Sequence, residues 1–412
     1  MTWKLLALGA LGSLLGAQTY DLLLKGGRVL DPKNNINAVM DVAIDGGKIA
    51  KVAANIPASD AKRVANVAGL TVTPGLIDIH VHVYPRPENK TFTDSNVLAD
   101  SHTFRSGVTT VVDAGTSGWR NFPDFRDRAI SKAQTRILAL LNISGAGMGT
   151  GREDELTELD PAAAAKAAKA NRDVVVGFKS AHFGGPGWES VEAAVKAGRE
   201  ADMPVMIDFG YMNGVRNLPT LLLDKLRAGD IYTHCYSGHR EELLADGKVN
   251  PAIFTGRKRG IIFDLGFGAG SFYWYVAVPS AQQGFLPDSI STDLHTGSMN
   301  SGMKSMTNSM SSVLNLGATF EQVVQMSTWN PAKEIKRREL GNLDVGAEAD
   351  VAVLRVDKGQ FGFIDSAGAG FTGSQRIVAE MTVRKGRVVW DLNARAAENW
   401  KTFKYERKKW TK

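Results

Sequence analysis

The sequence predicts an α/β protein: a (β/α)₈ barrel of the TIM type, with a small composite β-domain built from both ends of the chain. Two patterns carry this prediction. Between residues 74 and 337, strand-like apolar runs alternate with helix-forming stretches and give eight β-units, the number and size of such a barrel. On either side, short strand-like runs are punctuated by glycine, proline and asparagine turns.

Residues 1–18 resemble a signal peptide. Lys4 precedes an apolar run of about 12 residues, which suits a signal-peptide core and is too short to span a bilayer. We therefore expect no stable membrane span, and a periplasmic or secreted protein if this segment is cleaved. An N-terminal helix on a cytoplasmic protein is the alternative.

The composite β-domain is predicted over residues 19–73 and 338–395. Strand-like runs at 20–24, 39–44 and 48–52 are matched near the other end by runs at 350–354, 377–383 and 386–390. Similar texture at both ends of a different middle predicts one domain assembled from both termini.

The barrel is predicted over residues 74–337. After a first strand at 76–83, its apolar runs lie at 109–112, 136–141, 174–178, 204–207, 230–233, 260–263 and 288–292. Alanine-rich segments at 161–171 and 191–200 have helix composition. In this fold the active site lies at the C-terminal ends of the strands.

The net charge of +6 is concentrated in a basic, aromatic tail at residues 396–412. Residues 401–412 alone carry six lysines or arginines and one glutamate, so the rest of the chain is near neutral. A near-neutral body without a phosphate-binding motif argues against nucleic acid as a partner. A small-molecule substrate is expected instead, and a homo-oligomer stays open.

His80 and His82 are the most informative residues of the first predicted barrel strand. Residues two apart on a strand point to the same face, so two imidazoles can chelate one metal ion. A chance pair on a solvated sheet face is the alternative. Pro74-Gly75 before the strand and the apolar residues within it argue against exposure.

Further polar residues follow later strands: Lys179 after the fourth, His234 after the sixth and Asp293 after the eighth. Together with the stretches 74–82, 112–115, 330–333 and 341–350, they make residues 20–392 resemble the amidohydrolase superfamily of metal-dependent hydrolases. The branch that is most similar contains dihydroorotase-like amidohydrolases and deacetylases.

The resemblance implies a role for each residue. His80, His82 and Asp293 would hold the more buried divalent metal, with zinc expected. Lys179, carboxylated by CO₂ to a carbamate, would bridge it to a second metal bound by His234. A hydroxide shared by the metals would be the nucleophile, and Asp293 would act as the catalytic base.

Residue-by-residue alternatives remain open. Lys179 could be an unmodified lysine paired with a carboxylate, His234 a satisfied core histidine, and Asp293 a helix cap. The superfamily usually has a histidine at the end of strand five, where this chain has Asp208. Asp208 could bind a second metal, leave it weakly held by His234, or mark a one-metal site. If it is a ligand, Asp208→His should be tolerated or tighten the second metal.

The resemblance implies hydrolysis of an amide or ester, as in a deacetylase acting on N-acyl amino acids or acetylated hydroxy acids. A cyclic amidohydrolase like dihydroorotase or hydantoinase is one alternative, and a catalytically silent barrel that only binds is another. Dihydroorotases have an arginine where this chain has Tyr84, which disfavours ring opening. Tyr84 and Arg152, in the glycine-rich loop 144–153, are the candidate substrate-binding residues.

Overall fold

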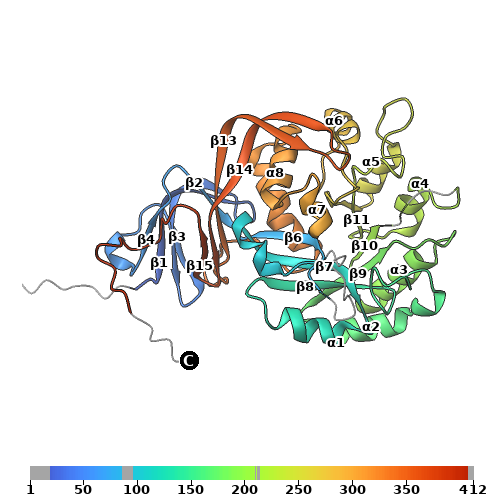
Figure 1. Cartoon of the computed structure of the whole chain (residues 1–412), viewed down its shortest axis with the longest axis horizontal. Coiled ribbons are helices and arrows are strands. Elements are labelled where there is room, and N and C mark those ends of the chain that lie inside the picture. Colours follow the sequence, from blue (N-terminus) through green and yellow to red (C-terminus); the bar gives the residue numbers. More distant parts are fainter. Residues whose placement is uncertain (1–18, 86–95, 209, 211–213, 407–412) are drawn as a thin grey trace, which may run out of the picture.

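The computed structural model describes residues 19–85, 96–208, 210 and 214–406. Figure 1 shows a sheet built from both chain ends beside a larger barrel surrounded by helices. The fold prediction is confirmed: a parallel barrel sheet accompanies a separate mixed β-sheet.

Seven parallel strands form the barrel sheet and pair in sequence order. They are β6 (Leu76–Val81), β7 (Val108–Gly118), β8 (Arg136–Asn142), β9 (Val175–Ala181), β10 (Val205–Asp208), β11 (Ile231–Tyr232) and β12 (Ile262–Phe263). The eighth predicted strand is an irregular segment that closes the ring through two parallel bridges, Asp264 to Ser289 and Val81 to Leu294. The strands β6, β7 and β9 are buried along their whole length, as expected for a parallel sheet covered on both faces.

The helices lie around this sheet. They are α1 (Phe122–Phe125), α2 (Pro161–Ala170), α3 (Glu189–Ala201), α4 (Leu218–Thr220), α5 (Pro251–Lys258), α6 (Trp274–Gln282), α7 (Thr296–Asn300), α8 (Met306–Asn315), α9 (Phe320–Ser327) and α10 (Trp329–Glu334). The two alanine-rich stretches correspond to α2 and α3. Asp160 caps α2 by accepting hydrogen bonds from the backbone N–H groups of Ala162 and Ala163, and Pro161 supplies its first turn.

The second sheet combines strands from both ends of the chain. Its order is β15-β14-β13-β5-β1-β2-β3, with β4 paired to β1. The strands are β1 (Leu22–Asp31), β2 (Ile36–Asp45), β3 (Lys48–Ala53), β4 (Val64–Asn66), β5 (Thr71–Pro74), β13 (Val351–Ile364), β14 (Gly370–Arg384) and β15 (Arg387–Asp391). The antiparallel pairing of β13 with β5 joins the two halves. The composite sheet expected from the sequence is therefore present.

The hairpin of β13 and β14 is longer than the sequence pattern indicated, and its outer half leaves the second sheet to cross the barrel, as Figure 1 shows. Phe363 joins the barrel core, and the Phe371 ring stacks on Trp274 of α6 with ring centroids 4.5 Å apart. At the hairpin tip, the Ser366 hydroxyl accepts hydrogen bonds from the backbone N–H groups of Ser271 and Phe272. The hairpin therefore holds a barrel loop in place.

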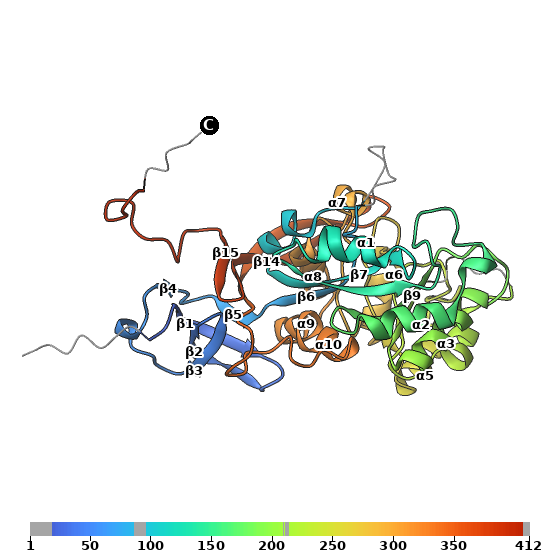
Figure 2. The same ribbon diagram turned by 90° about the horizontal axis from the view of Figure 1, so that it is seen from below.

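The first and the last described segments of the chain both lie at the end of the molecule that holds the second sheet, as Figure 2 shows from below. The predicted signal peptide falls outside the described residues. Of the basic tail, residues 396–406 are described, and Trp400, Phe403 and Tyr405 are exposed there. Within the described part of the chain, no helix combines the length and apolar character that crossing a membrane requires.

Candidate active site

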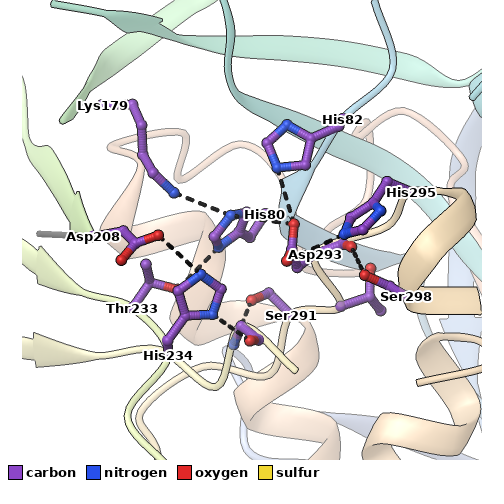
Figure 3. A network of polar contacts seen from close by, with 12 residues as sticks. His80, His82, Lys179, Asp208, Thr233, His234, Ser291, Asp293, His295 and Ser298 are labelled. Atoms are coloured by element: carbon purple, nitrogen blue, oxygen red, sulfur yellow. Dashed lines mark hydrogen bonds and ion pairs between the residues drawn. The ribbon is translucent and has the colours of Figure 1, made fainter. Parts of the chain in front are cut away.

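The strand ends of the barrel bring all six predicted metal ligands to one cavity of about 290 Å³. Figure 3 shows their side chains converging from β6, β9, β10 and the segments that follow β11 and precede α7. The described lining residues are His80, His82, Asn96, Met148, Lys179, His182, Asp208, His234, Ala269, Gly270, Ser271, Asp293 and His295. The polar lining is concentrated where the strands end, as in other barrels of this type.

His80, His82 and Asp293 form a group that could hold one metal ion. The Nε2 atom of His82 lies 2.9 Å from Oδ1 of Asp293, and the Nε2 atom of His80 lies 3.7 Å from the same oxygen. One ligand atom from each residue falls within a 4.8 Å span. Burial, together with the nearby Lys179, holds the pKa of His80 well below its usual value, so this imidazole is neutral as a ligand must be.

Hydrogen bonds on the far side of the rings aim the histidines at the cavity. The Nδ1 atoms of His80 and His82 lie 2.9 Å and 2.8 Å from the hydroxyls of Thr233 and Thr116. The Thr233 hydroxyl donates its proton to Asp264, so it accepts from the N–H at Nδ1 of His80. The Nε2 lone pair of His80 therefore faces the cavity, where it can bind a cation.

His234 is oriented in the same way. Its Nδ1 lies 2.5 Å from the backbone carbonyl oxygen of Gly266, which can only accept a hydrogen bond. The Nε2 atom of His234 therefore carries the lone pair and faces the cavity. Its backbone has a φ of 61°, and Asp293 and His182 also have positive φ values, 53° and 57°. Left-handed backbone at three lining residues is unusual and typical of functional sites.

Lys179 is fully buried at the end of β9, and its Nζ lies 3.0 Å from Nε2 of His80. Burial lowers the pKa of its ammonium, which favours the neutral amine. Gly115 leaves room for this side chain: a Cβ there would come within 2.7 Å of Cβ of Lys179, and its φ of 85° suits glycine.

Asp208 lies beside His234, with Oδ2 3.4 Å from Nε2 of that histidine and 3.8 Å from Nε2 of His182. Its other oxygen, Oδ1, forms a buried ion pair with Arg240. Burial alone would raise the pKa of Asp208, but the charge of Arg240 holds that pKa well below its usual value. The carboxylate is therefore ionised.

Asp293 is also ionised. Burial would raise its pKa, but hydrogen bonds from His295 and His82 hold it well below the usual value. The Nδ1 atom of His295 accepts a hydrogen bond of 3.1 Å from the backbone N–H of Gly297, so Nε2 carries the proton and faces Oδ2 of Asp293 at 3.6 Å. One carboxylate oxygen thus faces the two histidines of β6, and the other faces His295.

The two candidate substrate-binding residues do not line the cavity. Tyr84 is buried, donates a hydrogen bond of 2.6 Å to Asp124 and packs on Phe125. Arg152 is paired with Glu155 and Glu158. Both side chains are bound to other residues of the chain, and these partners could not be identified from a single sequence.

Several lining residues lacked a firm sequence signal. His182 and His295 follow two predicted ligands by three and two residues, which was the available hint. Met148 comes from the glycine-rich loop 144–153, which also contains Arg152. Ala269–Ser271 come just before the aromatic residues 272–275, and these aromatic residues are not among the described lining residues. Arg240 and Thr233 are buried beside the candidate ligands, and no motif in the sequence predicted their roles.

Comparison with known proteins identifies the family of this chain. The model of the "Amidohydrolase family" matches residues 71–216 and 277–389. Proteins named deacetylase from Enterococcus faecalis and Agrobacterium fabrum are 29% and 32% identical over 90% and 80% of this chain, and over 99% and 81% of their own lengths. Solved structures titled as an adenine deaminase and a dihydroorotase, both 28% identical, superpose with TM-scores of 0.81 and 0.77 over 90% of this chain and 100% and 99% of theirs.

The chain belongs to the amidohydrolase family. It is a hydrolase that acts on carbon–nitrogen bonds, as the family and the named relatives indicate.

Proposed function

We propose that this protein is a metal-dependent deacetylase or acylase that cleaves an amide or ester, with N-acyl amino acids and acetylated hydroxy acids as the substrate classes. One observation carries the proposal: the Nε2 atoms of His80, His82 and His234 point into one cavity because each Nδ1 is tied to a hydrogen-bond partner behind it. The relatives named deacetylase support the acyl group.

The donor set fits one or two divalent ions, and zinc is the ion we propose. His80, His82 and Asp293 would hold the first, and Asp208 and His234 the second. Lys179 would join them as a carbamate, formed when its neutral amine attacks CO₂ and loses a proton. Imidazole nitrogens with carboxylate oxygens are a common zinc ligand set. Ions bound there would polarise the substrate carbonyl and lower the pKa of the attacking water.

Asp293 is placed to move the proton. As water attacks the acyl carbon, the carboxylate takes a proton from it, and then gives that proton to the leaving nitrogen or oxygen as the bond to carbon breaks. His295 keeps the carboxylate oriented through Oδ2. Because its pKa is held low, Asp293 starts the cycle ionised, as a base must be.

The cyclic alternative is weakened by Tyr84. At the place where dihydroorotases carry an arginine, this side chain is buried against Asp124 and Phe125 and does not reach the cavity. Arg86, the arginine two residues after Tyr84, lies outside the described residues. The dihydroorotase structure that superposes on this chain keeps ring opening as the second candidate.

Metal analysis and a substrate screen test the proposal together. The purified protein, stripped with a chelator and reconstituted with zinc and bicarbonate, should hydrolyse members of a panel of N-acetyl amino acids and acetylated hydroxy acids. Asp293→Asn should be inactive on the same panel. Hydrolysis of dihydroorotate or hydantoin alone would favour the cyclic alternative. A protein that binds no divalent ion and stays inactive would instead be a silent barrel.

A further inference from the structure

Arg240 is a buried cation that lies directly behind the second group of candidate ligands. Its side chain is 3% exposed, and its guanidinium is paired with Oδ1 of Asp208. Its Nε donates a hydrogen bond of 3.0 Å to the backbone carbonyl of Gly210. A buried charge of this kind is costly unless it is paired, so Arg240 and Asp208 depend on each other.

Other contacts fix the position of Arg240. Its guanidinium lies over the Tyr232 ring, 5.6 Å from the centroid, and its backbone N–H donates to Oε2 of Glu242 at 3.1 Å. Glu242 is itself held at Oε1 by the hydroxyls of Tyr232 (2.9 Å) and Ser237 (2.6 Å). The guanidinium therefore cannot swing away when a cation enters the cavity.

The two carboxylate oxygens of Asp208 have different partners. Oδ1 belongs to Arg240, whereas Oδ2 faces the Nε2 atoms of His234 and His182. Figure 3 shows the Asp208 carboxylate beside the His234 ring. Oδ2 is thus the oxygen that is available to a cation in the cavity.

In the part of the chain that the structure describes, no arginine is paired with Asp293, the carboxylate of the first group of ligands. Among the described residues, the ion-pair partners of Asp293 are His80, His82 and His295. Asp293 can therefore offer a full negative charge to a cation, whereas the charge of Asp208 is balanced by a fixed guanidinium. At short range in a buried site, one unit of charge changes cation affinity strongly.

We infer that Arg240 is a fixed counter-charge that offsets the negative charge of Asp208 and so makes the second cation position the weaker of the two. This inference rests on the metal-dependent function proposed above. It also changes what we expect of Asp208→His. With Arg240 in place, that substitution removes the carboxylate that offsets the guanidinium charge beside the second cation, so it should weaken binding of the second ion.

Four proteins test the inference: the wild type, Asp208→His, Arg240→Met and the double variant. Each is stripped of metal and titrated with zinc against a chromophoric chelator in the presence of bicarbonate, which reports the number and affinity of bound ions. We expect one tight and one weaker ion in the wild type. Asp208→His should weaken the second ion by roughly tenfold or more, and Arg240→Met should tighten it by a similar factor. The double variant should return close to the wild type.

Arg384→Met is the matched control. Arg384 is another buried arginine, paired with Glu348 and with Asp350 at 3.0 Å in the second sheet. Its loss should lower thermal stability without changing either ion affinity. If Asp208→His does not fold, as judged by circular dichroism, Asp208→Asn takes its place, because a neutral amide also leaves Arg240 unbalanced.

The sign of the Arg240→Met effect decides the matter. A purely structural arginine would orient Asp208, so its loss would weaken the second ion, and that result would overturn the inference. A double variant as weak as Asp208→His would overturn it too. A wild type that hydrolyses its substrate with a single bound ion would reject the inference while leaving the proposed function intact, whereas a wild type that binds no ion would reject both.

Discussion

Replacing Thr233 by valine should show whether zinc affinity depends on the hydrogen bond that anchors His80, beyond any effect on the stability of the fold. The Thr233 hydroxyl is completely buried, accepts from Nδ1 of His80 at 2.9 Å and donates to Asp264 at 2.7 Å. Valine has nearly the same shape but can make neither bond. The substitution therefore removes the group that fixes the His80 tautomer and leaves the packing almost unchanged.

The structure sets the expected size of both effects. Asp264 loses the hydrogen bond from Thr233 but keeps those from the hydroxyls of Ser289 at 2.9 Å and Ser291 at 2.6 Å. The N–H at Nδ1 of His80 is left buried without an acceptor, which should lower the free energy of unfolding by about 1–3 kcal/mol. Loss of the group that orients a ligand histidine should weaken zinc binding by about 10–100-fold.

Competition with a chelator measures the change in zinc affinity. Urea denaturation of the metal-free protein measures the change in the free energy of unfolding. Thr382→Val is the control, because Thr382 is equally buried and donates one hydrogen bond of 2.6 Å to the carbonyl of Phe104, far from the cavity. It should cost stability and leave zinc affinity unchanged. If Thr233→Val behaves like this control, the anchoring of His80 does not govern metal binding and the reasoning fails.

Three further predictions concern other parts of the molecule. Lys179→Ala should abolish any gain in zinc content that bicarbonate gives the wild type, and equal zinc content with and without bicarbonate in both proteins would contradict the carbamate. Burial raises the pKa of Glu334 well above its usual value of 4.5, so the folded state binds the extra proton and the free energy of unfolding should fall as pH rises above 4.5. Glu334→Gln should therefore stabilise the protein more at pH 8 than at pH 5 in urea titrations, and an equal effect at both would count against this cause. Ser366→Ala removes the acceptor for the Ser271 backbone N–H at the cavity wall, so it should raise KM several-fold with unchanged zinc content, and an unaltered KM would show that the hairpin tip does not shape the cavity.

The fold could be predicted from the chain because its signals are local. Apolar runs and turn residues mark each strand, and the cap at Asp160 marks the start of α2. The long hairpin of β13 and β14 could not be predicted in the same way. Its outer half is held by Ser366, which contacts residues 95 and 94 positions earlier in the chain, and by Phe371, which stacks on the similarly distant Trp274.

The candidate site shows the same division. The six predicted ligands reach one cavity because each follows a strand, and parallel strands end at the same side of a barrel. Arg240 carried no such signal, since it lies in a loop and its partner Asp208 is 32 positions away. The sequence therefore identified Asp208 as unusual without showing what balances its charge.

The irregular eighth strand and the candidate site for the first metal have one common cause. In a regular strand the backbone N–H of Thr292 would pair with a neighbouring strand, but here it donates to the buried carboxylate of Asp78 at 3.1 Å. The next residue, Asp293, then adopts a φ of 53° and turns its carboxylate toward His80 and His82. One residue later the carbonyl of Leu294 accepts from the N–H of His82 at 2.9 Å and closes the barrel. Regular pairing is lost at the seam where the chain presents the candidate ligand Asp293, and hydrogen bonds to Asp78 and His82 attach this segment to the first barrel strand on both sides of His80.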